Sequence, residues 1–232
     1  MGLHAYCVVP AARTCGTTGI AGAPVRGVAL PPLAVWTSEH GHRPAATLAA
    51  ARAHDAVIRA AHDEQLTPVP LRFGQWFEDE AHLVAAVADR VPGWSALLEE
   101  LAGTVELGVR VTGPTTTASA VPGTVTHDPV AHEPMASGTE YMQVLRDRHR
   151  AEAAVEARRA AVLDALRAAL GALVQKEYVA PDPGPGTLLS VAYLVRRATL
   201  RACQAAIDTV PERFAELRFN VSGPWPPYSF VA

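Results

Sequence analysis

The order of apolar patterns in the second half of the chain constrains the fold more than any other feature. Residues 104–111 predict a plain strand, residues 188–194 are apolar at nearly every position and predict a strand covered on both faces, and residues 217–221 alternate as a half-buried strand does. Helical spacing of apolar residues predicts a long helix over 137–174 and another over 200–210. With a short strand after the long helix, the order is βαββαβ, which is the ferredoxin-like pattern.

The first hundred residues carry a smaller α+β pattern. Residues 3–9 predict a strand, and residues 25–36 predict a second, irregular strand interrupted by Pro31-Pro32. Residues 47–65 have the apolar spacing of a helix. Residues 66–73 predict an edge strand, because their two prolines cannot donate backbone hydrogen bonds to a neighbour.

A helix over residues 79–102, bent or split at Pro92-Gly93, completes this first part. We therefore expect an α+β protein with two domains and a tail. The expected parts are an N-terminal α+β domain over 1–103, a ferredoxin-like domain over 104–222 and a C-terminal tail over 223–232.

Residues 113–137 show no periodic pattern. Pro, Thr, Gly, Ala and His dominate this segment, and it holds few large apolar side chains. Such a segment cannot bury enough apolar surface to offset the entropy lost on ordering. We expect a mobile loop that is dispensable for folding.

The composition excludes several classes of function. The net charge of −3 gives no electrostatic reason for binding nucleic acid or anionic lipid. No apolar run is long enough to span a membrane, and the N-terminus lacks a signal peptide's basic region, so we expect a cytoplasmic protein. The three cysteines are an odd number without C-x-x-C spacing, which argues against a disulfide framework or a zinc site.

Two His-Asp pairs are the candidates for chemistry. Imidazole and carboxylate groups are common zinc ligands and general bases, so a metal-dependent hydrolase using His54 and Asp55 is the alternative hypothesis. The second pair, His62 and Asp63, lies eight residues on, which is about 80° around a helix and not on one line. We favour half-buried structural roles, with no catalytic residue, metal ligand or cofactor.

Arg72 lies between the expected edge strand and Gly74, beside Phe73 and Trp76. A planar guanidinium in such a place can bridge carbonyls or stack on an aromatic ring. A structural role within the domain and direct contact with a partner are both open.

The last residues carry the most specific pattern. The sequence GPWPPYSF at residues 223–230 resembles the ending of the GvpF/GvpL gas vesicle proteins. Three further segments resemble the family in the same order: PLRFG at 70–74, VELGVRV at 105–111 and AYLV at 192–195. The resemblance extends over nearly the whole chain.

This resemblance implies a non-enzymatic accessory or minor structural protein. Such a protein would contact the main shell protein GvpA and other accessory proteins during assembly of the gas vesicles that make cells buoyant. The family offers no catalytic residues to carry over.

The tail has two readings. It is formally a P-x-x-P ligand, but its prolines also preset an extended conformation, so that its aromatic side chains can dock on the protein itself at little entropic cost. We expect it to fold back and join the two domains. The candidate partner-binding or interdomain residues are Arg72, Phe73, Gly74, Pro224, Trp225, Pro226, Pro227, Tyr228 and Phe230.

Overall fold

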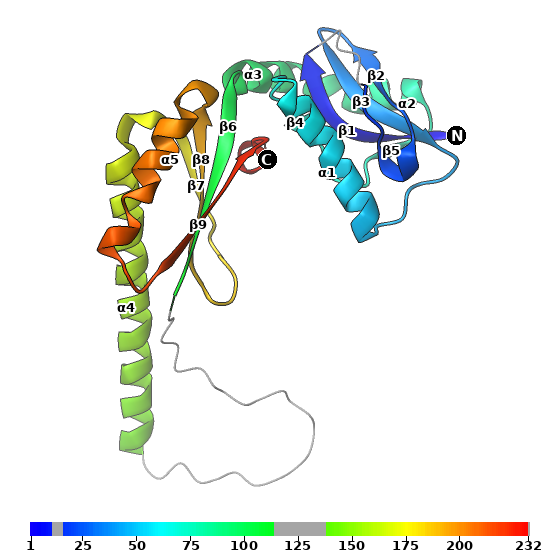
Figure 1. Cartoon of the computed structure of the whole chain (residues 1–232). Coiled ribbons are helices and arrows are strands. Elements are labelled where there is room, and N and C mark those ends of the chain that lie inside the picture. The colour runs from blue at the N-terminus through cyan, green and yellow to red at the C-terminus, as the bar shows by residue number, and fades with distance from the viewer. Residues whose placement is uncertain (11–15, 114–137, 232) are drawn as a thin grey trace, which may run out of the picture.

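The computed structural model describes residues 1–10, 16–113 and 138–231. In this part of the chain, two antiparallel β-sheets follow one another along the sequence, and helices pack on each (Figure 1). The α+β class is confirmed. Apart from Gly113, the expected mobile loop over 113–137 lies outside the described residues.

The first sheet has the strand order β2-β3-β1-β4, and β5 also pairs with β1. Its strands are β1 (Gly2–Pro10), β2 (Val25–Leu30), β3 (Leu33–His40), β4 (Val69–Pro70) and β5 (Trp76–Phe77). The expectation of one irregular strand over 25–36 is wrong. The chain reverses at Pro31-Pro32, so that Leu30 pairs with Leu33 and the segment forms a hairpin.

The expected strand over 66–73 is much shorter, because only Val69–Pro70 pairs with β1. Gln65 and Thr67 have positive φ angles of 64° and 43°, so the chain first turns sharply out of the preceding helix. The strand does lie at the sheet edge, as its proline predicts.

Three helices cover the first sheet: α1 (Leu48–Asp63), α2 (Glu80–Val87) and α3 (Val91–Leu101). The side chains of Thr47 and Asp79 cap the first two, accepting hydrogen bonds from backbone N–H groups three residues on. The expected split of the second helical stretch falls at Ala88–Arg90 instead of Pro92. Pro92 instead occupies the first turn of α3, where its missing N–H costs nothing.

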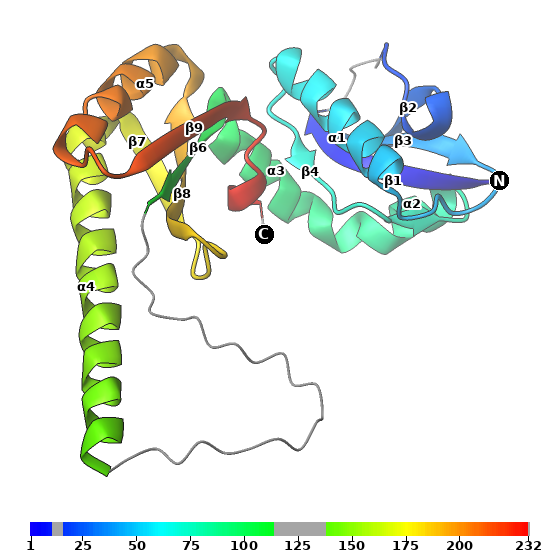
Figure 2. The ribbon, with the colours of Figure 1, turned by 60° about the horizontal axis from the view of Figure 1, so that its bottom comes forward.

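The first sheet lies between α1 on one face and α2 with α3 on the other (Figure 2). Val57, Ile58 and Ala61 of α1 share a core cluster with Tyr6 and Trp36. A second cluster joins the opposite face to α2 and α3, including Leu3, Val35, Leu83, Val87 and Leu98. Because both faces of β1 are covered, all its residues before Pro10 are buried.

The second sheet has the order β7-β8-β6-β9. Its strands are β6 (Thr104–Thr112), β7 (Val174–Val179), β8 (Thr187–Arg196) and β9 (Arg218–Trp225). Helices α4 (Gly138–Leu170) and α5 (Leu200–Asp208) pack on one face (Figure 1). This core includes Leu107, Val109, Val162, Leu166, Val191, Cys203 and Ile207.

Two features of this half differ from a minimal sheet-and-helix layer. The N-terminal part of α4 extends past the sheet and exposes Tyr141, Met142 and Val144 (Figure 2). Strand β9 runs to Trp225, three residues into the segment assigned to the tail, because its pairing with β6 resumes between Glu106 and Trp225. None of the described helices is both long and apolar enough to cross a membrane.

Candidate functional site

The residues after β9 cross from the second sheet to helix α1, so that the C-terminus lies between the two sheets (Figures 1 and 2). The Tyr228 hydroxyl donates a hydrogen bond to Asp55 Oδ1 on α1 at 2.5 Å. The other Asp55 oxygen accepts from Arg59 Nε at 2.7 Å. Burial, together with the neighbouring carboxylate, raises the pKa of Tyr228, so the phenol stays neutral and acts as the donor.

Glu106 of β6 holds the same tail from the other side. Its carboxylate accepts from Ser229 N at 2.8 Å and from Ser229 Oγ at 2.9 Å. Only 7% of Glu106 is exposed, and this burial raises the pKa of its carboxyl group, partly opposed by the two hydrogen bonds. Tyr228 and Ser229 are adjacent, so two neighbouring residues connect α1 with the second sheet.

Apolar and cation–π contacts add to these hydrogen bonds. The Arg59 guanidinium lies 4.3 Å from the ring centroid of Trp225, so Arg59 contacts both Asp55 and the tail. Tyr228 packs on the core cluster under α1, and Val231 packs on the cluster under α2 and α3. Pro226 and Pro227 are buried, whereas Pro224 is exposed and Phe230 is half-buried.

Two further contacts, which do not involve the tail, connect the helices of the first sheet with the second sheet. Arg197, which follows β8, donates to His62 Nε2 at 3.0 Å and to the His62 carbonyl oxygen at 3.1 Å. Burial, with the nearby Arg197 charge, lowers the pKa of His62 to about 4, so the imidazole is neutral and accepts. Lys176 of β7 forms an ion pair with Glu100 of α3.

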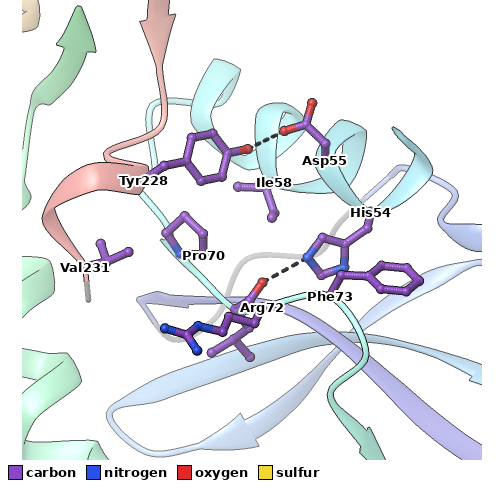
Figure 3. A pocket seen from close by; sticks show the side chains of 9 residues that line it. His54, Asp55, Ile58, Pro70, Arg72, Phe73, Tyr228 and Val231 are labelled. Carbon is purple, nitrogen blue, oxygen red and sulfur yellow. Dashed lines mark hydrogen bonds between the residues drawn. The ribbon is translucent and has the colours of Figure 1, made fainter. Parts of the chain in front are cut away.

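A pocket of about 350 Å³ opens beside the tail (Figure 3). Helix α1, the segment around β4 and the tail each provide part of its wall, and the lining residues are His54, Asp55, Ile58, Pro70, Leu71, Arg72, Phe73, Tyr228 and Val231. The structure thus brings Arg72, Phe73 and Tyr228 together, although they are far apart in the sequence.

The predicted residues at 72–74, of which Arg72 and Phe73 line the pocket, have different surroundings. Arg72 is exposed and makes no hydrogen bond or ion pair with any residue that the structure describes. Phe73 is half-buried, and its ring lies 5.3 Å from that of His4 and 5.6 Å from that of His54. Gly74 has a φ of 93°, which favours glycine, and its carbonyl accepts from Arg43 Nη2 at 2.7 Å.

His54 is tied into the protein interior. One ring nitrogen, Nε2, lies 2.9 Å from the Leu71 carbonyl oxygen, which can only accept, so Nε2 carries the proton. The other nitrogen, Nδ1, therefore accepts from His4 Nε2 at 2.9 Å. Burial lowers the pKa of both rings, that of His4 to about 4, and each stays neutral.

The hydrolase hypothesis gains no support from this geometry. His54 contacts His4 and Leu71, whereas Asp55 contacts Tyr228 and Arg59, so the two candidate residues do not converge on one point. Across the described residues, no three His, Cys, Asp or Glu side chains gather where a metal ion could bind.

Sequence reasoning missed the residues that receive the tail. Arg59, which contacts Trp225, carries no signal in a single sequence, and neither does Ser229, the tail residue that binds Glu106. Glu106 carries none either, because residues 105–111 alternate between apolar and other residues, and Glu106 falls on the same face of the strand as Arg110. From the sequence, Asp55 is a candidate metal ligand or general base, and no local pattern indicates that it accepts a hydrogen bond from Tyr228.

A family model described as gas vesicle synthesis protein GvpL/GvpF matches residues 2–232. The chain belongs to this family. The resemblance found in the sequence is therefore confirmed, and GvpL/GvpF proteins take part in forming gas vesicles.

Relatives of known name agree with this assignment. Gas vesicle protein F2 of Halobacterium salinarum is 30% identical over 190 residues, covering 81% of this chain and 70% of the relative. Gas vesicle protein L of a Streptomyces species is 33% identical over 192 residues, covering 78% and 68%.

Two solved structures share the fold. GvpF from an Anabaena species has a TM-score of 0.82 at 17% identity, and the match covers 100% of this chain and 96% of that chain. GvpF from Microcystis aeruginosa has a TM-score of 0.80 at 16% identity, with 100% and 99% covered.

Proposed function

We propose that this member of the GvpL/GvpF family is a non-enzymatic accessory or minor structural protein of gas vesicle assembly. It binds the shell protein GvpA and other vesicle components in the cytoplasm and at the growing vesicle. Family membership supports the role in vesicle formation. The observation that favours binding over catalysis is the pocket beside the tail, which is largely apolar and whose histidine and aspartate already have partners within the protein.

We further propose that the chain works as two domains held in one orientation by the tail. The domains are residues 1–103 and residues 104–222, the second of them ferredoxin-like, with residues 223–232 as the tail. Separate core clusters in the two halves and the βαββαβ order of the second half support this division. The contacts of Tyr228 with Asp55 and of Ser229 with Glu106 support the role of the tail.

The contact with GvpA is proposed to be mainly apolar. The chain is 49% hydrophobic and only 19% charged, and apolar contacts are screened little by salt. Nucleic acid is not a proposed partner, since the net charge is −3, and neither is a membrane.

Co-purification with GvpA tests this function. Wild-type protein should retain GvpA between low salt and about half-molar salt, where exposed charge pairs are strongly screened. Complete release over that range would contradict an apolar contact, and no binding at any salt concentration would contradict the choice of GvpA.

A second experiment tests the tail in cells. The wild-type gene is replaced, in a vesicle-forming host, by a gene lacking the codons for residues 226–232 or carrying Trp225→Ala. Both changes should abolish or strongly reduce vesicles while the protein is still made. Tyr178→Phe is the matched control, because Tyr178 is 45% exposed and belongs to β7, at the edge of the second sheet opposite β9. Normal vesicles in the deletion strain would show that the tail is dispensable.

A further inference from the structure

The pocket beside the tail has the size of a side-chain site. Its volume of about 350 Å³ is near the lower end of the range for ligand pockets, about 300–1,000 Å³, so it suits one or two large side chains better than a bulky cofactor. Ile58, Pro70, Phe73 and Val231 supply apolar wall (Figure 3). A large apolar group could therefore enter the pocket while few polar groups of the wall lose their contact with water.

The polar side chains that line this pocket differ in whether they are free to bind a partner. Asp55 is held by Tyr228 and Arg59, and His54 is neutral and bonded at both nitrogens. Arg72 alone among the charged lining residues lacks a partner in the described part of the chain. Its side chain lies along the edge of the pocket below Pro70, with its guanidinium pointing outward (Figure 3). The rim therefore presents one unpaired positive charge beside an apolar hollow.

This combination selects for a particular chemistry. A guanidinium pairs best with a planar carboxylate, which it can contact through two parallel N–H groups. An apolar side chain next to that carboxylate would enter the hollow. A polyanion such as nucleic acid fits poorly, because one arginine at an apolar pocket in a chain of net charge −3 is no basic surface.

From these contacts we infer that the pocket binds a partner segment in which an acidic residue adjoins a large apolar one. Arg72 pairs with the carboxylate, and the apolar side chain packs against Phe73 and Ile58. The inference rests on the proposed function, in which this protein binds vesicle components, and it names the chemistry of the segment they would present. Because Tyr228 and Val231 line the same pocket, the docked tail is part of the binding site.

The test is a selection from a display library of random seven-residue peptides on the immobilised full-length protein. Wild type, Arg72→Gln and Arg201→Gln are compared. Arg201 is an exposed arginine of α5, and α5 lies on the side of the second sheet that faces away from the pocket (Figure 1). Arg201→Gln is therefore the matched control, because it removes one positive charge elsewhere. Wild type and Arg201→Gln should enrich peptides with Asp or Glu beside a large apolar residue. Arg72→Gln should lose the acidic preference.

A selected peptide then provides the quantitative readout. Arg72→Gln should weaken its binding about five-fold, and replacing the peptide's acidic residue by its amide should weaken wild type equally but leave Arg72→Gln unchanged. Arg72→Lys keeps the positive charge but lacks the planar guanidinium, so its affinity for the peptide should lie between those of wild type and Arg72→Gln. No enrichment, or an acidic preference that survives in Arg72→Gln, would overturn the inference.

The outcome is separable from that for GvpA. GvpA binding without any peptide preference overturns this inference alone. An acidic–apolar preference without GvpA binding supports the pocket chemistry and overturns GvpA as the partner.

Discussion

The Tyr228 hydroxyl donates a hydrogen bond to the Asp55 carboxylate, 173 residues earlier in the chain. Asp55 belongs to α1, which covers one face of the first sheet, whereas Tyr228 lies three residues after Trp225, the last residue of β9 in the second sheet. The relative position of the two sheets therefore depends in part on a few residues at the C-terminus.

Tyr228→Phe should lower the free energy of unfolding by about 1–2 kcal/mol. It removes one hydrogen bond to a charged group, so Asp55 Oδ1 loses its donor while Arg59 stays bound to Oδ2. Because the Asp55 side chain is 37% exposed, water can take the place of the tyrosine hydroxyl. Urea unfolding measures the change. Tyr178→Phe, at a 45% exposed tyrosine of β7, is the control and should have no effect. Equal stability of the two variants would show that the Tyr228 hydroxyl contributes nothing.

Glu106 can be tested by contrasting an amide with a truncation. Glu106→Gln should stay within about 1 kcal/mol of wild type, because the amide oxygen can accept from Ser229 N and the amide N–H can donate to Ser229 Oγ. The raised pKa of Glu106 means that ionisation opposes folding, so the amide loses no favourable charge at neutral pH.

Glu106→Ala, in contrast, leaves the Ser229 N–H without its acceptor and should cost about 1–3 kcal/mol in chemical unfolding. The amide exchange of Ser229 should accelerate in this variant and not in Glu106→Gln. If both substitutions cost the same, the hydrogen bonds do not hold the tail.

Gly223 should not tolerate a side chain. Its φ is 117°, and an added Cβ would lie 2.6 Å from the Glu106 carbonyl oxygen. Gly223→Ala should therefore cost about 2 kcal/mol or more, through strain where β9 meets the tail. Gly93→Ala is the control: an added Cβ meets no atom within 4 Å in helix α3, and the change should stabilise by about 0.5–1 kcal/mol. Thermal unfolding compares them, and a stable Gly223→Ala would contradict the clash.

Stability should fall as the pH drops from about 6.5 towards 4. His4 and His62 each have a pKa lowered to about 4 in the folded protein, from 6.5 when unfolded, so the unfolded chain takes up protons first. Each residue's contribution is fully present above pH 6.5 and is lost on acidification, by at most about 3 kcal/mol. His62→Gln should flatten this dependence in urea titrations while keeping an acceptor for Arg197. An unchanged pH slope would show that His62 is not responsible.

Local sequence patterns were enough to predict the helices and strands that depend only on the spacing of their own apolar residues. The strands β6 and β8 and helix α1 follow from their apolar spacing, because burial of one face or both imposes a period on the sequence. The same reasoning failed at residues 25–36, where a hairpin depends on which strands pair, and at residues 66–73, where the end of α1 leaves room for only two paired residues.

By itself, the sequence determined the α+β class, most of the element order and, through its terminal motif, the family. The tertiary structure alone decided that Asp55 and Glu106 receive the same few C-terminal residues and that Arg72, beside them, pairs with none of the residues that the structure describes. Periodicity reports which side chains leave water, but not which partner they meet. The partner of a buried polar group is set by the packing of segments more than a hundred residues apart.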